Sequence, residues 1–371
     1  MNLLQIVQAV APSITDANLS QPFDDIDIDS FDLLTIRVDL ERTFAHDIPD
    51  SAWVEFRSFA DIGRYFDGVP RSGPRGGQSR DSSGVDRDIE LNMPQMAIGS
   101  MSENWLFKEM GSTHWHLLCE GLDTASNALS DEMGNRLYAT FARVQISGAA
   151  LDLFTENENL HLTGQLSRYG NGMYYSQMSL TSLERPESVL AVRMITSFSR
   201  RSGEGNKNLV KSHPASPVNT IENLSSVPPF IDEYRMIKKG GVGSRLDLAG
   251  HTFLVGDESV FDVEYDLNPY YDLNGAGLLY FASYPTINDF CEAKYFNGLA
   301  DAQGRWEQSF FTSSRDIMYY ANCDINDGIQ YRLNSVEADG DRRYIASSLY
   351  RKSDGQLMAR VFTVKNRAAV G

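Results

Sequence analysis

The chain has 371 residues, of which 42% are hydrophobic and 22% are charged, values close to those of soluble globular proteins. Its net charge of -17 argues against nucleic-acid binding over the whole chain, because nucleic-acid-binding proteins carry basic faces that neutralise phosphates. No apolar run approaches the roughly 20 residues of a membrane span, and the N-terminus lacks the basic start of a signal peptide, so we expect a cytoplasmic protein without a membrane role. The three cysteines lie far apart and lack metal-ligand spacing, which favours neither a disulfide framework nor a metal site.

The first 68 residues hold a large share of the acidity, with 13 acidic side chains against four basic ones. Apolar residues recur at helical spacing around Leu3, Leu33 and Phe59, so we predict a small helical bundle over residues 1–68. Residues 69–90 are rich in Gly, Ser, Pro and Arg and nearly devoid of apolar side chains. This composition predicts a flexible linker.

The run DDIDIDSFDLL, residues 24–34, places Ser30 after an acidic loop and at the start of an amphipathic helix. This run resembles the acyl carrier protein family, whose D-S-L motif presents a serine for 4′-phosphopantetheine, with Phe31 here in place of the leucine. The resemblance implies phosphopantetheine on Ser30. It also makes Asp32, Asp39 and Glu41 candidate docking charges for basic partner surfaces. A serine that only caps a helix would fit the same position.

After the linker, the sequence predicts a helix followed by alternating strand-like segments, and it does so twice. The two helices are expected over residues 98–120 and 277–296. DGDR at 339–342 and KSDG at 352–355 have the turn chemistry of hairpins. We therefore predict an α+β fold of two similar units, residues 91–205 and 206–371, packed side by side.

The segment DLNGAGLLYFASYPTINDFCEA begins at Asp272 and resembles the hot-dog thioesterase signature, in which D-x-x-G enters the central helix. The resemblance implies two hot-dog units, each an antiparallel sheet wrapped on a central helix. Gly275 and Gly277 would expose backbone N–H groups at a helix N-terminus, where the helix dipole favours a developing oxyanion on a thioester. The alternative is that these glycines only permit a tight turn.

Three segments in this order, residues 92–115, residues 134–144 and the run from Asp272, are similar to the LnmK-type double-hot-dog acyltransferase/decarboxylases of polyketide pathways. The resemblance implies transfer of a malonyl-type group from coenzyme A to a carrier phosphopantetheine, with loss of carbon dioxide. It also implies a polyketide synthase as partner. That family uses a key tyrosine, which the motif RLYATF assigns to Tyr138; the alternative is a strand tyrosine with its ring in the core.

Decarboxylation of a malonyl thioester yields an enolate, so the site needs hydrogen-bond donors for the oxyanion and an apolar pocket that destabilises the carboxylate. This chemistry needs no metal or redox cofactor. Tyr138 could donate a hydrogen bond to the enolate, although it would need activation to act as a nucleophile. We expect the reaction where the first helix begins, at Gly99 and Ser100, facing the strand that bears Tyr138. The second helix entry instead offers Asp272 and Asn274 in a signature suited to hydrolysis, and in a decarboxylase Asp272 would serve substrate placement or stability.

His114 and His116 are two residues apart on the first predicted helix and point to different faces, so they are not a metal pair. One can be a satisfied core histidine, and a supporting role for His114 at the substrate is the alternative. Residues 193–245 carry nine basic side chains against four acidic ones. Lys238 and Lys239 lie there in a connection expected to be flexible, where coenzyme A phosphates or an acidic carrier helix are natural partners. Scattered solubilising charge explains the same pattern.

The resulting hypothesis is a carrier domain tethered to an enzyme that loads a polyketide starter from malonyl- or methylmalonyl-coenzyme A. About 20 disordered residues span roughly 25 Å, so docking in cis is feasible, and a separate carrier is the other acceptor. One alternative is a hydrolase in which Asp272 activates water and releases a free acid from an acyl-carrier thioester. Another is a non-catalytic double hot dog that binds acyl carriers.

Overall fold

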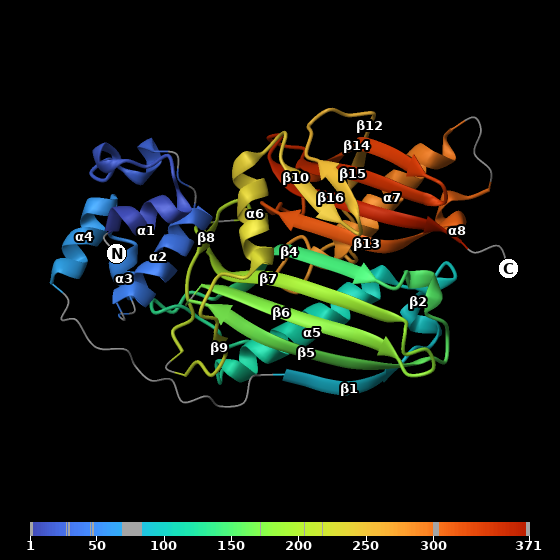
Figure 1. The fold of residues 1–371 in the computed structure, drawn as a ribbon, viewed down its shortest axis with the longest axis horizontal. Coiled ribbons are helices and arrows are strands. Elements are labelled where there is room, and N and C mark those ends of the chain that lie inside the picture. The colour runs from blue at the N-terminus through green and yellow to red at the C-terminus, as the bar shows by residue number, and fades with distance from the viewer. Residues whose placement is uncertain are drawn as a thin grey trace.

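The computed structural model of the chain describes residues 3–26, 28, 30–44, 46, 48–68, 84–170, 172–203, 205–216, 218–299 and 304–368. A small helical body lies beside a larger body built on one twelve-stranded, almost entirely antiparallel sheet (Figure 1). We refer to them as the carrier body, after the resemblance of its sequence to acyl carrier proteins, and the sheet body.

The carrier body confirms the expected helical character of the N-terminal region, with its helices lying within residues 3–67. Apolar side chains spaced at helical turns, including Ile6, Ile36 and Ile62, are buried in a core of its own. Its last helix begins with a capping box, in which Asp61 Oδ2 accepts a hydrogen bond from the Ser58 backbone N–H at 2.9 Å. The helices are α1 (Leu3–Val10), α2 (Ser30–Phe44), α3 (Asp50–Trp53) and α4 (Phe59–Asp67).

The first half of the sheet body contains one long helix and the strands that flank it. They are β1 (Gly84–Glu90), α5 (Glu103–Gly121), β4 (Tyr138–Gly148), β5 (Asn159–Tyr169), β6 (Met173–Ser182) and β7 (Val189–Arg201). Two short strands, β8 (Leu209–Lys211) and β9 (Glu222–Asn223), pair with β7 and β5.

The second half repeats this series. It contains β12 (Phe261–Asp266), α7 (Tyr284–Asn297), β13 (Phe310–Tyr319), β14 (Gly328–Asp339), β15 (Arg342–Arg351) and β16 (Leu357–Arg367). A short helix, α8 (Trp306–Ser309), precedes β13. The hairpins expected at 339–342 and 352–355 connect β14 to β15 and β15 to β16.

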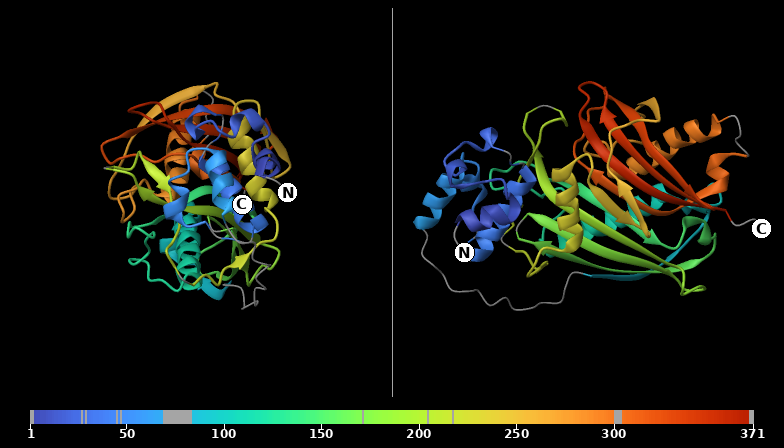
Figure 2. Two further views of the ribbon diagram at one scale, coloured as in Figure 1. Left: turned by 90° about the vertical axis from the view of Figure 1, so that its left-hand side faces the viewer. Right: turned by 45° about the horizontal axis from the view of Figure 1, so that its top comes forward.

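The strands run in the order β1-β5-β6-β7-β4-β13-β16-β15-β14-β12, so both halves have the same order when read outward from the β4–β13 junction. In each half the long helix follows the edge strand in sequence. The views in Figure 2 show α5 and α7 enclosed by the curving sheet. These helices and the strands share one core of apolar side chains from both halves, which includes Met110 of α5, Val144 of β4 and Ile287 of α7.

The segment between the two halves covers the opposite face of the sheet. It contains α6 (Pro229–Gly240), β10 (Arg245–Leu248) and β11 (His251–Leu254). Phe230, Tyr234 and Ile237 of α6 pack into a second core on this face. Lys238 and Lys239 therefore lie in the last turn of a helix, which corrects the expected flexible connection.

Three further boundaries differ from the sequence-based expectations. Part of the expected linker, Gly84–Glu90, pairs with β5, because its alternating side chains complete the sheet edge; residues 69–83 lie outside the described residues. The first long helix begins at Glu103, after a hairpin of β2 (Met96–Ala97) and β3 (Ser100–Met101). The second begins at Tyr284, because residues 273–279 close into a turn with a bridge between Leu273 and Leu279.

Within the described residues, no helix combines the length and apolar character needed to cross a membrane. Cys119, Cys291 and Cys323 are free thiols.

Candidate active site

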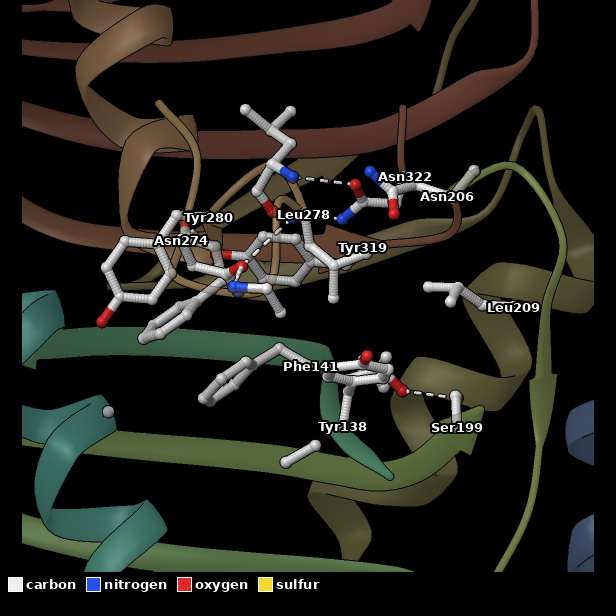
Figure 3. Close-up of a pocket in the computed structure, with 18 of the residues that line it drawn as sticks. Tyr138, Phe141, Ser199, Asn206, Leu209, Asn274, Leu278, Tyr280, Tyr319 and Asn322 are labelled. Atoms are coloured by element: carbon white, nitrogen blue, oxygen red, sulfur yellow. Dashed lines mark hydrogen bonds between the residues drawn. The ribbon is translucent and has the colours of Figure 1, made fainter. Parts of the chain in front are cut away.

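A cavity of about 630 Å³ lies where the two halves of the sheet body meet. The first half contributes α5, the start of β4 and β8, and the second contributes the turn before α7 and the end of β13. Figure 3 shows Tyr138 and Phe141 on one side of this space, opposite Asn274 and Tyr280 on the other. The cavity therefore combines residues that the sequence analysis assigned to two separate centres.

The floor of the cavity is apolar and aromatic. Phe141 of β4 stacks on Phe281, with ring centroids 3.7 Å apart. Gly111 of α5 makes room for this pair, because a Cβ atom at Gly111 would lie 2.4 Å from the Phe281 ring. The close approach of the two halves therefore depends on a glycine in the middle of α5.

Tyr138 begins β4 and lines the cavity, half-buried, rather than packing its ring into the core. Its hydroxyl accepts a hydrogen bond from Arg201 Nη1 at 3.1 Å. The guanidinium groups of Arg201 and Arg136 also lie 5.1 Å and 5.7 Å from the Tyr138 ring centroid. Asn206 fixes the guanidinium of Arg201 by accepting from its Nε and Nη2 at 3.1 Å and 2.8 Å.

Sequence reasoning missed the Arg201–Tyr138 contact. Arg201 counted only as one charge in a basic segment, because 63 residues separate the partners and no local motif joins them. The register of β4 on β7 supplies the connection, since it pairs Tyr138 with Ser199, two residues before Arg201.

The turn before α7 is organised by two side chains of the hot-dog signature. Asp272 is only 3% exposed and does not line the cavity; its Oδ2 accepts from Tyr265 Oη at 3.0 Å and from the Asn268 N–H at 2.7 Å. Burial raises the pKa of Asp272. Asn274 lines the cavity, and its Oδ1 accepts from the N–H groups of Ala276 and Leu278 at 2.9 Å and 3.1 Å. Asp272 therefore holds the turn in shape.

Gly275 and Gly277 lie in this turn, several residues before α7 begins at Tyr284, so the expected position at a helix N-terminus is wrong. The signature enters a turn and the short 3-10 helix η5 (Phe281–Ser283) before the helix starts. Gly275 lines the cavity, whereas Gly277 does not and has a φ of 74°, a left-handed conformation that favours glycine.

Gly99 and Ser100 lie in the β2–β3 hairpin and do not line the cavity. The Ser100 hydroxyl donates to the Ala97 carbonyl at 3.1 Å. The start of α5 instead faces β13, where Glu103 and Arg315 form a buried ion pair at 2.8 Å. Burial raises the pKa of Glu103 to about 7. The expected meeting of Gly99 and Ser100 with Tyr138 does not occur.

His114 contacts the cavity but is a satisfied core histidine. It is fully buried, with Nδ1 2.9 Å from Ser176 Oγ and Nε2 2.7 Å from Thr196 Oγ1. Burial lowers its pKa to about 3, so the ring is neutral at physiological pH. His116 of the same helix is exposed, so the two histidines point to different faces, as expected.

The residues that line the cavity include four basic ones: Arg136, Lys207, Lys211 and Lys238. Lys211 Nζ donates to Thr140 Oγ1 at 3.2 Å, and Lys207 pairs with Asp327 at 3.1 Å. Lys239 is exposed and does not line the cavity. Among the described lining residues there is no aspartate, glutamate or cysteine.

In the carrier body, Ser30 is the first residue of α2, where the helix N-terminus can accommodate the phosphate of an attached group. Of the three candidate docking charges, Asp39 reaches the sheet body, since its Oδ1 accepts from Tyr169 Oη at 2.6 Å. Glu41 is buried and holds the carrier body together through Arg37 Nε and the Ile48 N–H, both at 3.0 Å. Asp32 is also buried.

Residues 2–66 match the family described as "Phosphopantetheine attachment site". The N-terminal region is therefore an acyl carrier domain. The chain is similar to an oleoyl thioesterase, provisionally so assigned, from Lactobacillus plantarum, with a TM-score of 0.54 and 10% identity over 78% of this chain and 97% of that one.

A second similar structure is the 12:0-ACP thioesterase from Umbellularia californica, with a TM-score of 0.50 and 10% identity over 78% of this chain and 99% of that one. At these identities the likeness shows the fold alone, so the sheet body has a hot-dog thioesterase-like fold. A search of curated proteins found no match.

Proposed function

We propose that the protein loads a starter unit for polyketide synthesis. In this proposal a double hot dog transfers a malonyl-type acyl group from coenzyme A to a carrier phosphopantetheine and decarboxylates it. The observation that carries the proposal is the chemistry of the cavity: hydrogen-bond donors and cations above an aromatic floor, without a carboxylate or thiol among the described lining residues.

This chemistry suits decarboxylation better than hydrolysis. Hydrolysis of a thioester needs a group that activates water or attacks the carbonyl. The proposed candidate, Asp272, points into its own turn, and both ring nitrogens of His114 contact hydroxyl groups in the core. Decarboxylation instead needs a place where the carboxylate is poorly solvated and donors that stabilise the enolate oxygen. The rings of Phe141 and Phe281 offer a poorly solvated place for the carboxylate, and the Tyr138 hydroxyl offers a donor for the enolate oxygen.

The bond changes balance with water as the one further reactant. The bond between the α-carbon and the carboxylate breaks, carbon dioxide leaves, and the electron pair forms a thioester enolate, whose α-carbon then takes a proton from water and leaves hydroxide. In the transfer step the pantetheine sulfur bonds to the carbonyl carbon as the bond to coenzyme A sulfur breaks. The proton of the pantetheine thiol ends on coenzyme A.

Tyr138 is the residue we assign to the enolate oxygen. Its oxygen accepts from Arg201 through a lone pair, so the hydroxyl hydrogen remains to be donated. Arg201 is a positioning residue in this scheme, because it holds the phenol from the side of β7. The cations Arg136, Lys207 and Lys211 suit the phosphates of coenzyme A or of the carrier arm.

The test is intact-protein mass spectrometry of the phosphopantetheinylated chain with malonyl- and methylmalonyl-coenzyme A. An acetyl or propionyl adduct on the carrier, lacking the mass of carbon dioxide, is the expected result. Release of free acid supports the thioesterase alternative, with which the fold is compatible. The absence of any reaction supports the non-catalytic binding module, and either outcome contradicts the proposal.

A further inference from the structure

The carrier body is seated on the sheet body through α2, the helix that begins at Ser30. Leu34 and Val38 of α2 are 4% and 0% exposed, and both belong to the core on the α6 face of the sheet. Neither is part of the core of the carrier body. Two apolar side chains of this helix are thus buried against the sheet body instead of in the core of the carrier body.

The sheet body is shaped for these side chains at the turn between β5 and β6. A Cβ atom at Gly172 would lie 2.3 Å from Leu34 Cδ1, and one at Gly170 would lie 2.3 Å from Val38 Cγ1. Gly170 has a φ of 62°, so its backbone also favours glycine, whereas the φ of Gly172 lies outside the left-handed range. The absence of a side chain at Gly172 therefore leaves room for Leu34 of the carrier and for His213, whose Cε1 would lie 2.8 Å from the same Cβ atom.

A polar contact fixes the position of the helix along this surface. The Tyr169 hydroxyl, on the residue before Gly170, donates to Asp39 Oδ1 at 2.6 Å, a hydrogen bond to a charged acceptor. Leu34 near the start of α2 and Asp39 one turn further on thus have separate partners. Together they determine the direction in which α2 lies.

This direction places the Ser30 end of α2 on the side of β8, which leads to the cavity. Leu34, one turn after Ser30, contacts the region of His213, two residues beyond Lys211. A small cavity of about 40 Å³ at this contact is lined by Leu34, Arg200, Lys211 and His213 among others. Lys211 also lines the large cavity, so it borders both spaces.

We infer that this seat is a docking site for the fused carrier, from which the arm on Ser30 enters the large cavity of the same chain. The inference rests on the proposed function only for the reaction that follows, and it identifies the acceptor as the carrier in cis. The contact is mainly apolar, because Leu34, Trp53 and Val54 of the carrier line the small cavity, and the Tyr169–Asp39 hydrogen bond adds a polar contact beside it.

The experiment uses the full chain with a pantetheine arm that carries a photoreactive diazirine, attached to Ser30. After irradiation, peptide mapping identifies the cross-linked residues, and electrophoresis separates cross-links within one chain from those between two chains. Fusion gives effective concentrations of about millimolar, so at ~10 μM protein we expect intramolecular products to exceed intermolecular ones by roughly 100-fold. We expect them to map to residues 136–142 or 274–281.

Two variants test the seat from opposite sides. Gly172→Leu fills the space of the Leu34 side chain, and Leu34→Gln alters the carrier without touching its own core; each should remove most of the cross-link to the cavity. Gly256→Leu is the matched control, because a Cβ atom there meets nothing within 4 Å. A predominantly intermolecular product, or cross-links unchanged in both variants, would overturn the inference.

The outcome is separate from that of the proposed function, because photochemical cross-linking requires no catalysis. Cross-linking in cis without a decarboxylated product would support the docking site and contradict the proposed reaction. Decarboxylation of malonyl-coenzyme A with cross-links only between molecules would support the reaction and contradict the docking site.

Discussion

The ring of Phe141, from the first half of the sheet body, stacks on the ring of Phe281, from the second half, with 3.7 Å between centroids and 23° between planes. These residues are 140 positions apart in sequence, yet they form one floor beneath Tyr138 and Asn274. The candidate site therefore exists only when both halves are packed together.

Gly111→Ala tests this packing. In an ordinary helix the change adds up to about 1 kcal/mol of stability, whereas overpacking a core costs about 1–3 kcal/mol. The new methyl group would lie 2.4 Å from the Phe281 ring, so we expect the overpacking to dominate and the free energy of unfolding to fall. Urea titration measures it, with Gly256→Ala as the control at an open position. A variant more stable than wild type would refute the close packing.

Tyr138→Phe tests the proposed hydrogen-bond donor. The ring and its cation–π contacts with Arg136 and Arg201 remain, whereas the hydroxyl is lost together with its hydrogen bond from Arg201 Nη1. Removal of one oxyanion donor lowers turnover by about 10²–10³-fold, and we expect a loss of this size in single-turnover decarboxylation. The unfolding midpoint should change little. Tyr270→Phe, at an exposed tyrosine outside the cavity, is the matched control. Near-normal turnover in Tyr138→Phe would assign the chemistry to other groups.

Ser30→Ala tests the attachment site. Incubation with coenzyme A and a promiscuous phosphopantetheinyl transferase should add one phosphopantetheine to the wild-type chain and none to the variant. Intact-protein mass spectrometry measures the mass gain. Modification that persists in the variant would place the attachment elsewhere.

Asp272→Asn separates turn stability from chemistry. A hydrogen bond to a charged group contributes about 1.5–3 kcal/mol, so weakening the contacts with Tyr265 and Asn268 should lower the free energy of unfolding by roughly 1–3 kcal/mol. At saturating thioester the single-turnover rate should stay close to that of the wild type. A rate as low as that of Tyr138→Phe, in a folded variant, would bring Asp272 back into the reaction.

His114 predicts a pH dependence of stability. Its pKa is lowered from 6.5 to about 3 by burial, so the unfolded chain takes up a proton there before the folded chain does. Stability from this group is present above pH 6.5 and is lost as the pH falls towards 3, with a slope of up to about 1.4 kcal/mol per pH unit. His114→Gln should remove that part of the slope in urea titrations at several pH values, whereas the exposed His116→Gln should keep it. Equal slopes in wild type and His114→Gln would contradict the prediction.

Local sequence patterns gave the carrier bundle and most of the strands correctly. Helical spacing of apolar residues around Leu3, Leu33 and Phe59 reflects which side of each helix is buried, and that is decided within a few turns. The same holds for the alternating segments of β5 and β15. The helix starts were set too early because turns before Glu103 and Tyr284 also contain apolar residues.

The sequence by itself predicted Ser30 as the attachment serine and determined the repeated order of helix and strands and the tyrosine at the start of β4, because each depends on residues close together in the chain. Only the tertiary structure decided which segments of the two halves meet at the cavity. Pairing of β4 with β13 sets the turn of the second half against the strand of the first, which brings Asn274 to Tyr138 and leaves Gly99 and Ser100 outside. Contacts between residues far apart in sequence follow from strand register and packing, and a motif carries no record of either.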